Sequence, residues 1–160
     1  DLPKLGNEAA SRAPSSGCFS TQDGSLLMLA ANNEQQFAAL CGVLGHPEWP
    51  EDPRWIDPGT RAVNQASLRE VFEKAFLSKP ASQWEALLDE AGVPASRVRK
   101  LSETLAEGQP QARGMLQTLT VGAEQIQVSL PGIGFRMNGQ SLIPDSPPRG
   151  PGADTPRWQD

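Results

Sequence analysis

Apolar side chains recur at helical spacing in three stripes between residues 37 and 91. Intervals of three and four residues in the first stripe place its side chains on one face of a helix. Asn32 and Asn33 offer side-chain oxygens that can cap its start, and Gly45 favours its end. The sequence therefore predicts an amphipathic helix between these limits. The members of the first stripe are Phe37, Leu40, Cys41 and Leu44.

The other two stripes predict two further helices. One occupies about residues 60–77, and the other begins near Ser82 and ends at Gly92. Ser82 and Glu85 have the spacing of a capping box, in which each side chain bonds to the backbone N–H of the other residue. Each helix should bury one apolar face. The second stripe contains Leu68, Val71, Phe72, Ala75 and Phe76, and the third contains Trp84, Leu87, Leu88 and Ala91.

Strand patterns stand before and after these helices. Asp23-Gly24 separates the run CFSTQ from Leu26–Ala30. This arrangement predicts a hairpin, because glycine tolerates the positive φ of a tight turn. Later, Met115–Val121 and Gln125–Leu130 alternate as strands around the turn sequence GAEQ, and we expect a third short strand within 131–139.

A weaker helix at Leu101–Glu107 and a helical turn at Pro110–Arg113 lie between the main helices and the later strands. This order predicts an α+β fold with short antiparallel strands and three to four amphipathic helices, rather than repeated βαβ units. The 160 residues suffice for one domain. We expect a linker or extended lead-in at 1–14, the domain at 15–145, and a Pro/Gly-rich polar tail at 146–160.

Composition narrows the classes of partner. A net charge of −5, with 14 scattered basic residues, argues against nucleic acid and against an anionic membrane surface. No apolar run in these residues is long enough to span a bilayer, and we expect no signal segment. Cys18 and Cys41 have neither a redox motif nor metal-ligand spacing. We expect two reduced thiols without a disulfide, in a cytoplasmic protein.

The stretch HPEWPEDPRW, residues 46–55, concentrates acids, aromatic rings, prolines and the one histidine. A single histidine among irregularly spaced acids, with prolines between them, lacks the geometry of a closed zinc site. We therefore predict no metal and interpret the stretch as a connector whose Trp49 and Trp55 pack on neighbouring helices. The residues weighed as metal ligands are His46, Glu48, Glu51 and Asp52.

The remaining candidates for catalysis or phosphate binding are also better explained as structural residues. A Cys41/His46 nucleophile pair is disfavoured, because apolar surroundings raise the pKa of a thiol. The glycines of PGIGFRMNG, 131–139, open no helix that could hold a phosphate, so a turn-rich connection is the preferred interpretation. No two acids pair as general acid and base, and solvated or capping roles are expected. The acids considered are Asp23, Asp52, Asp57, Glu70 and Asp89.

The order and spacing of several motifs carry a family resemblance. They include the Asp-Gly turn, G-x-P-E-W-x-x-D-P-R at 45–54, W-x-x-x-L-x-x-x-G-V-P at 84–94, QPQARGML, and PPRGPGADT. Arg61, Asn64 and Leu68 stand between the second and third of these. Together they closely resemble the class III CoA-transferases, which include formyl-CoA and carnitine-CoA transferases and 2-methylacyl-CoA racemases. The resemblance runs from about Gly6 to Thr155.

The resemblance implies that this chain corresponds to the small α+β domain of such an enzyme. In the family a large domain carries the aspartate nucleophile of the transferases and the histidine and acid of the racemases. We therefore assign no catalytic residue and no cofactor-binding residue here, and expect coenzyme A thioesters as substrates only of the complete enzyme. The implied partners are the large domain, in the same or a separate chain, and a second copy in a homodimer.

Two positions depart from the family pattern. GNEAAS at 6–11 stands where formyl-CoA transferases carry a run of glycines, and Asp154 stands where the family often has histidine. The chain is therefore either a small domain that helps close a CoA-thioester site, or a free-standing binding module descended from one. In the first case, apolar side chains at 131–139 and Met115–Leu119 should lack a cover in the isolated chain.

Overall fold

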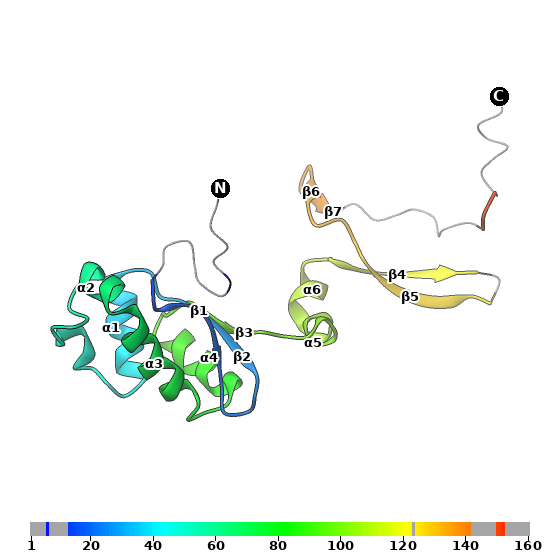
Figure 1. Cartoon of the computed structure of the whole chain (residues 1–160). Coiled ribbons are helices and arrows are strands. Elements are labelled where there is room, and N and C mark those ends of the chain that lie inside the picture. The colour runs from blue at the N-terminus through cyan, green and yellow to red at the C-terminus, as the bar shows by residue number, and fades with distance from the viewer. Residues whose placement is uncertain (1–5, 7–12, 123, 142–149, 153–160) are drawn as a thin grey trace. The chain divides into compact units, whose positions relative to one another are not determined.

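The computed structural model describes residues 6, 13–122, 124–141 and 150–152, and divides the chain into two compact units, Asp1–Val98 and Arg99–Asp160 (Figure 1). Most of the expected lead-in at 1–14 and of the expected tail at 146–160 lies outside the described residues. The fold is α+β, as the sequence predicts, with short antiparallel strands and several helices.

The first unit contains a three-stranded antiparallel sheet in the order β1-β2-β3, formed by Ser16–Ser20, Leu26–Ala30 and Ala95–Arg97. The hairpin between β1 and β2 confirms the turn predicted at Asp23-Gly24, where Gly24 has a φ of +73°. The strand β3 was not predicted. Its three residues are too few to show alternation, and it pairs with β2 only because four helices return the chain there.

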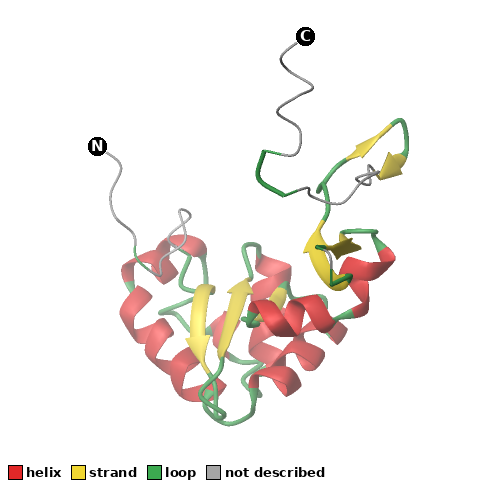
Figure 2. Ribbon diagram, turned by 90° about the vertical axis from the view of Figure 1, so that its right-hand side faces the viewer, coloured by secondary structure: helices red, strands yellow, loops and turns green. Residues whose placement is uncertain are grey.

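The helices of this unit pack against one face of the sheet (Figure 2). Leu27 and Leu29 of β2 are buried in the core, whereas Leu26 and Met28, which point the other way, are 42% and 47% exposed. The helical elements are α1 (Glu34–Val43), the 3₁₀ turn η1 (Trp49–Glu51), α2 (Pro58–Val63), α3 (Gln65–Phe76) and α4 (Ala81–Glu90).

The single helix predicted at about 60–77 is wrong, because two helices occupy this region. The break lies at Asn64, whose φ of −98° and ψ of 25° leave the helical region. Its side-chain amide donates to the carbonyl oxygens of Arg54 and Thr60, which fixes this corner. The helix α2 begins earlier than predicted, at Pro58, because Asp57 and Thr60 form a capping box.

The start of α4 also differs from the prediction. The helix begins at Ala81 with Pro80 as its N-cap, so Ser82 and Glu85 form no capping box. The Asp23 carboxylate in the distant hairpin accepts from the Ala81 N–H at 3.4 Å instead. Glu85 accepts from the backbone N–H of Arg97, at 3.1 Å, and so joins α4 to β3.

The predicted stripes form the core of the first unit. Trp84 and Trp55 are each 1% exposed, whereas Trp49 is only half-buried at the edge of the core. Ala91 is exposed, which contradicts its place in the third stripe, because the helix has ended at Glu90. The other core members include Phe19, Phe37, Leu40, Cys41, Leu68, Phe72, Phe76, Leu88 and Val93.

The second unit consists of two short helices and two hairpins. The predicted helix, helical turn and paired strands are confirmed, whereas the third strand pairs within a separate small hairpin. Among the described residues of this unit, only Pro110 is buried. The elements are α5 (Leu101–Ala106), α6 (Gly108–Ala112), β4 (Leu116–Val121), β5 (Ile126–Pro131), β6 (Arg136–Met137) and β7 (Gln140–Ser141).

Candidate functional site

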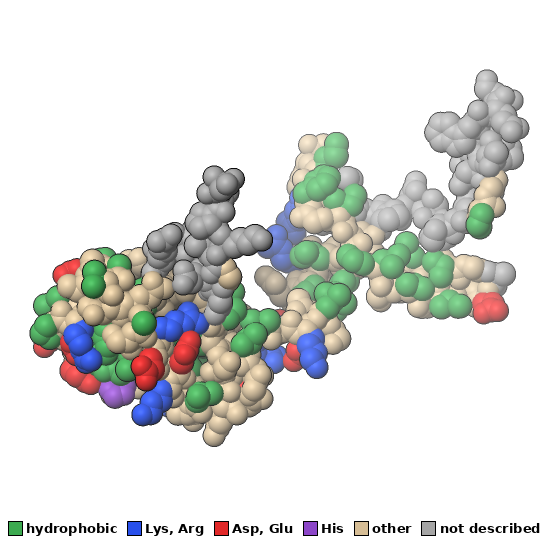
Figure 3. Space-filling view, viewed as in Figure 1, with side chains coloured by type: hydrophobic (Ala, Val, Ile, Leu, Met, Phe, Trp, Pro, Cys, Tyr) green, Lys and Arg blue, Asp and Glu red, His purple; other side chains and the backbone are tan. Residues whose placement is uncertain are grey.

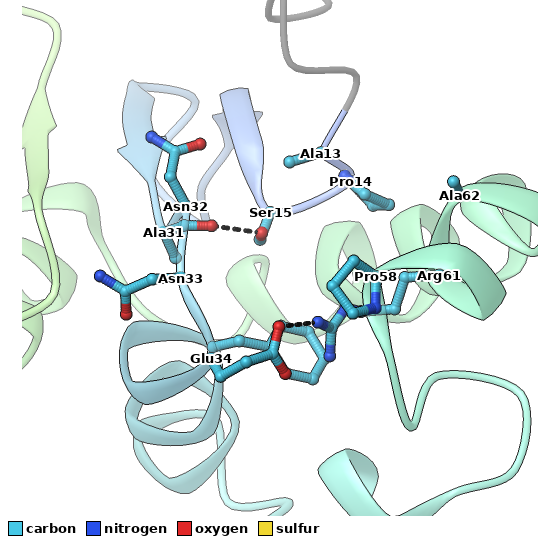
Figure 4. A pocket seen from close by; sticks show the side chains of 11 residues that line it. Ala13, Pro14, Ser15, Ala31, Asn32, Asn33, Glu34, Pro58, Arg61 and Ala62 are labelled. Carbon is cyan, nitrogen blue, oxygen red and sulfur yellow. Dashed lines mark hydrogen bonds and ion pairs between the residues drawn. The ribbon is translucent and has the colours of Figure 1, made fainter.

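A pocket of about 200 Å³ lies in the first unit where three segments meet: the lead-in to β1, the turn from β2 into α1, and α2 (Figure 4). Small apolar side chains and the Phe37 ring form most of its wall, and Arg61 and Glu34 supply its charges. The lining residues are Ala13, Pro14, Ser15, Ala31, Asn32, Asn33, Glu34, Phe37, Pro58, Arg61 and Ala62.

Arg61 is the buried cation of this pocket, with a side chain only 8% exposed. One terminal nitrogen donates to the carbonyl oxygen of Trp55 at 3.1 Å, and the guanidinium carbon lies 4.2 Å from the centre of the Phe37 ring. The other terminal nitrogen donates to Glu34. The capping box at the start of α2 fixes the helix that carries Arg61, so the guanidinium is held from several sides.

Glu34 approaches from the opposite side, on the first turn of α1 (Figure 4). Its side chain is 62% exposed, although it pairs with a buried arginine. The N-cap Asn33 accepts from the Gln36 N–H at 2.8 Å, which fixes the start of this helix. A negative charge is favourable there because the first turn carries the positive end of the helix dipole.

Two hydroxyl groups fix the remaining wall of the pocket. Ser15 donates to the carbonyl oxygen of Ala31 at 2.6 Å, and Ser16 donates to the side-chain oxygen of Asn32 at 2.7 Å. None of the lining residues, all of which the structure describes, is a cysteine or a histidine. The arrangement can therefore bind and orient an acid, but it presents no paired nucleophile and base.

Cys41, one member of the nucleophile pair that the sequence disfavours, is a core residue. Burial raises the pKa of its thiol to about 12, so the reactive thiolate is scarce at neutral pH. The His46 ring is engaged elsewhere: it stacks on Trp49 with ring centres 4.1 Å apart, and its Nδ1 lies 3.0 Å from Glu48. This geometry supports the packing interpretation of Cys41.

The stretch at 46–55 runs from α1 to α2 and contains η1, so it is the connector that the sequence predicts. Asp52 binds the Arg54 guanidinium, at 2.7 Å for the closest pair of atoms, and this hydrogen bond lowers the pKa of the carboxyl group to about 2. Glu51 is exposed. Among the residues that the structure describes, no three His, Cys, Asp or Glu side chains gather as metal ligands.

The other acids considered in the sequence lie apart from the pocket. Asp23 accepts hydrogen bonds in its own turn, and the bond from the Thr21 hydroxyl lowers the pKa of its carboxyl group. Asp57 caps α2, whereas Glu70 and Asp89 are exposed on helix surfaces. The glycine-rich segment 131–139 leads from β5 into the β6–β7 turn and opens no helix.

Sequence reasoning missed the pairing of Glu34 with Arg61. Arg61 entered only as one position of the family resemblance, and Glu34 was not singled out. The two residues are separated by 27 positions and belong to different helices. The available signal was that Arg61 lies three residues after Pro58, at the start of a helix. This position does not reveal that the arginine side chain points into the protein.

Comparison with known proteins identifies the family of this chain. Residues 1–155 match the sequence profile of CoA-transferase family III. The chain belongs to this family. It is 32% identical over 150 residues to an acetyl-CoA:oxalate CoA-transferase of Acetobacter aceti, covering 94% of this chain and 36% of that protein. It is 29% identical over 133 residues to a succinyl-CoA:glutarate CoA-transferase of Mus musculus, covering 81% and 29% respectively.

Solved structures of similar proteins support the fold. A CAIB/BAIF family protein from Brucella suis superimposes with a TM-score of 0.75 at 25% identity, over 98% of this chain and 40% of that one. Rv3272 from Mycobacterium tuberculosis gives 0.74 at 23% identity, over 86% of this chain and 38% of that one. This chain therefore spans between 29% and 40% of the length of these four proteins. No helix in the described part has the length and apolar character needed to cross a membrane.

Proposed function

We propose that this chain is the small-domain portion of a CoA-transferase, which helps close a CoA-thioester site while a large domain, in the same or another polypeptide, supplies the nucleophile. One observation carries the proposal: the match to CoA-transferase family III covers residues 1–155, yet the chain spans only 36% of the oxalate-using relative. The transferred group would be coenzyme A, exchanged between carboxylic acids.

The chemistry of the pocket is consistent with a chain that binds the substrate and leaves nucleophilic attack to the large domain. Arg61 and Glu34 can orient an anionic group, but neither arginine nor a carboxylate paired with arginine is an activated nucleophile. Cys41, the buried thiol of this unit, remains protonated. We therefore expect bond-making to depend on a residue outside this chain, and expect the chain alone to bind no cofactor.

The second unit supplies a surface for the large domain. Met115, Ile133, Phe135 and Met137 are exposed within the two segments where the sequence predicts uncovered surface. Figure 3 shows further apolar side chains along the β4–β5 hairpin. An isolated two-stranded hairpin is marginally stable in water, so a covering partner would contribute much of its stability. These exposed side chains lie in or beside the two hairpins and are called the second-unit patch: Met115 (41% exposed), Ile126 (52%), Leu130 (38%), Ile133 (41%), Phe135 (61%) and Met137 (56%).

The test is reconstitution of transfer from two pieces. The chain is purified alone and with a large-domain polypeptide encoded beside it, and each sample receives succinyl-CoA or acetyl-CoA with oxalate or glutarate. Mass spectrometry then measures the new acyl-CoA. We expect transfer only when both pieces are present. Turnover by the purified chain alone would refute the proposal, and so would a large-domain partner that is equally active without this chain.

A further inference from the structure

We propose that Arg61 is the binding site for the carboxylate of a small carboxylic acid, and that Glu34 occupies this site until the acid arrives. The pocket, the buried guanidinium and the exposed carboxylate that meets it carry this inference. That the bound acid is a substrate of CoA transfer rests on the proposed function. The binding itself does not depend on that function.

Arg61 is organised before any ligand binds. The carbonyl oxygen of Trp55 and the Phe37 ring hold the guanidinium in place, so little side-chain entropy remains to be lost on binding. Neither of these anchors is a charged group, and Glu34 is the carboxylate with which Arg61 pairs. A planar guanidinium binds carboxylates strongly because two parallel N–H groups can face the two oxygens.

Glu34 has the properties of a replaceable occupant. Its side chain is 62% exposed, so it can rotate into water without disturbing the core. A ligand carboxylate in its place leaves the charge of the pocket unchanged, which avoids an unpaired buried cation. The start of α1 also favours an anion at this position, because Glu34 lies in the first turn of a ten-residue helix.

The size of the pocket selects the class of ligand. Its volume of about 200 Å³ exceeds the roughly 10–15 Å³ that one water needs, but it is below the roughly 300–1,000 Å³ of sites that enclose drug-sized molecules. The walls that Ala13, Pro14, Pro58 and Ala62 contribute are apolar and suit a short carbon chain. A small mono- or dicarboxylic acid fits this description, whereas the nucleotide part of coenzyme A does not.

The test is a titration of the full chain with glutarate at low ionic strength, followed by ¹H–¹⁵N NMR. We expect saturable shifts at the backbone amides of the pocket. If Glu34 occupies Arg61 for about nine-tenths of the time, Glu34→Gln should lower the Kd for glutarate about tenfold. The matched control is Glu90→Gln, which removes the same charge from an exposed position at the end of α4 and should leave the Kd unchanged.

Arg61→Lys retains the charge but loses the two-pronged geometry, and should weaken glutarate binding. If this variant fails to give a folded spectrum, the comparison of Glu34→Gln with Glu90→Gln decides alone. Shifts that do not saturate, or equal Kd values for those two glutamate variants, would overturn the proposal. Inorganic phosphate is titrated in parallel, and tighter binding of phosphate than of glutarate at the same amides would also overturn it.

The two proposals fail separately. Glutarate binding that Glu34→Gln strengthens, without CoA transfer after reconstitution, would preserve the carboxylate site and reject the transferase role. Transfer by the reconstituted pair without glutarate binding at Arg61 would do the reverse.

Discussion

Trp84 offers a direct test of how the core of the first unit is held together. Its ring is 1% exposed and lies edge-to-face against Phe76, with ring centres 5.4 Å apart. Its indole N–H donates to the Phe76 carbonyl oxygen at 2.8 Å. That oxygen stands at the end of α3, and the residue four positions later is Pro80, which has no N–H to offer. Trp84 therefore supplies the donor that the backbone lacks.

Two substitutions separate the two contributions of this side chain. Trp84→Phe keeps most of the buried ring but leaves the Phe76 oxygen without its donor, which should cost about 1–3 kcal/mol of unfolding free energy. Trp84→Ala also removes the ring, and truncation of a buried tryptophan costs about 3–5 kcal/mol. The ordering wild type, Phe variant, Ala variant should therefore appear in the free energies of unfolding.

Urea denaturation followed by circular dichroism at the helix band measures all three proteins, because this signal does not depend on the removed chromophore. The midpoints should fall in the stated order with similar slopes. An unchanged midpoint for Trp84→Ala would show that the ring is not part of the core. A Phe variant as stable as the wild type would show that the hydrogen bond to Phe76 contributes nothing.

Three further predictions follow from the described geometry. The contact with Arg54 lowers the carboxyl pKa of Asp52 to about 2, below the value of about 4 in the unfolded chain. The stability that this contact contributes should be complete above about pH 4 and should be lost as the pH falls from about 4 to 2. Acid unfolding curves of Asp52→Asn should lack this contribution. Cys41 should resist iodoacetamide at pH 8 in the native chain and react after unfolding, as peptide mass mapping would show; rapid native labelling would contradict its burial. Finally, the second-unit patch should cause self-association at micromolar concentration or should bind hydrophobic dyes, and Phe135→Ser should reduce whichever of these is observed. A monomeric protein that binds no dye would favour the free-standing binding module instead.

The sequence predicts those helices and turns that depend only on residues close to one another in the chain. The stripe around Leu40 and the Asp-Gly turn each follow from local spacing, and both elements formed where expected. The break at Asn64 was missed because the apolar stripe begins only beyond it, and its side-chain bonds reach a carbonyl ten residues earlier. The strand β3 was missed for a related reason, since a three-residue strand is defined by its partner.

The candidate site was less accessible to sequence reasoning than the fold. The exclusion of Cys41 as a nucleophile depended on its apolar neighbours, which the helical spacing reveals. The pocket depends on the inward turn of Arg61 and on its meeting with Glu34, and no local pattern encodes that meeting. The position of Trp49 was equally hidden from the sequence, because no local pattern shows that its ring lies at the edge of the core and stacks on His46.

The position of β2 between β1 and β3 has a consequence for the order of folding. The pairing of β1 with β2 closes a short turn, whereas the pairing of β2 with β3 closes a long loop that contains α1 to α4. The entropy of loop closure rises with loop length, so the edge pairing of β3 should be among the last events. During synthesis, β2 keeps one edge open until Arg97 has left the ribosome. The nascent first unit therefore passes through a stage in which Leu27 and Leu29 lie on an unpaired edge that another chain could join.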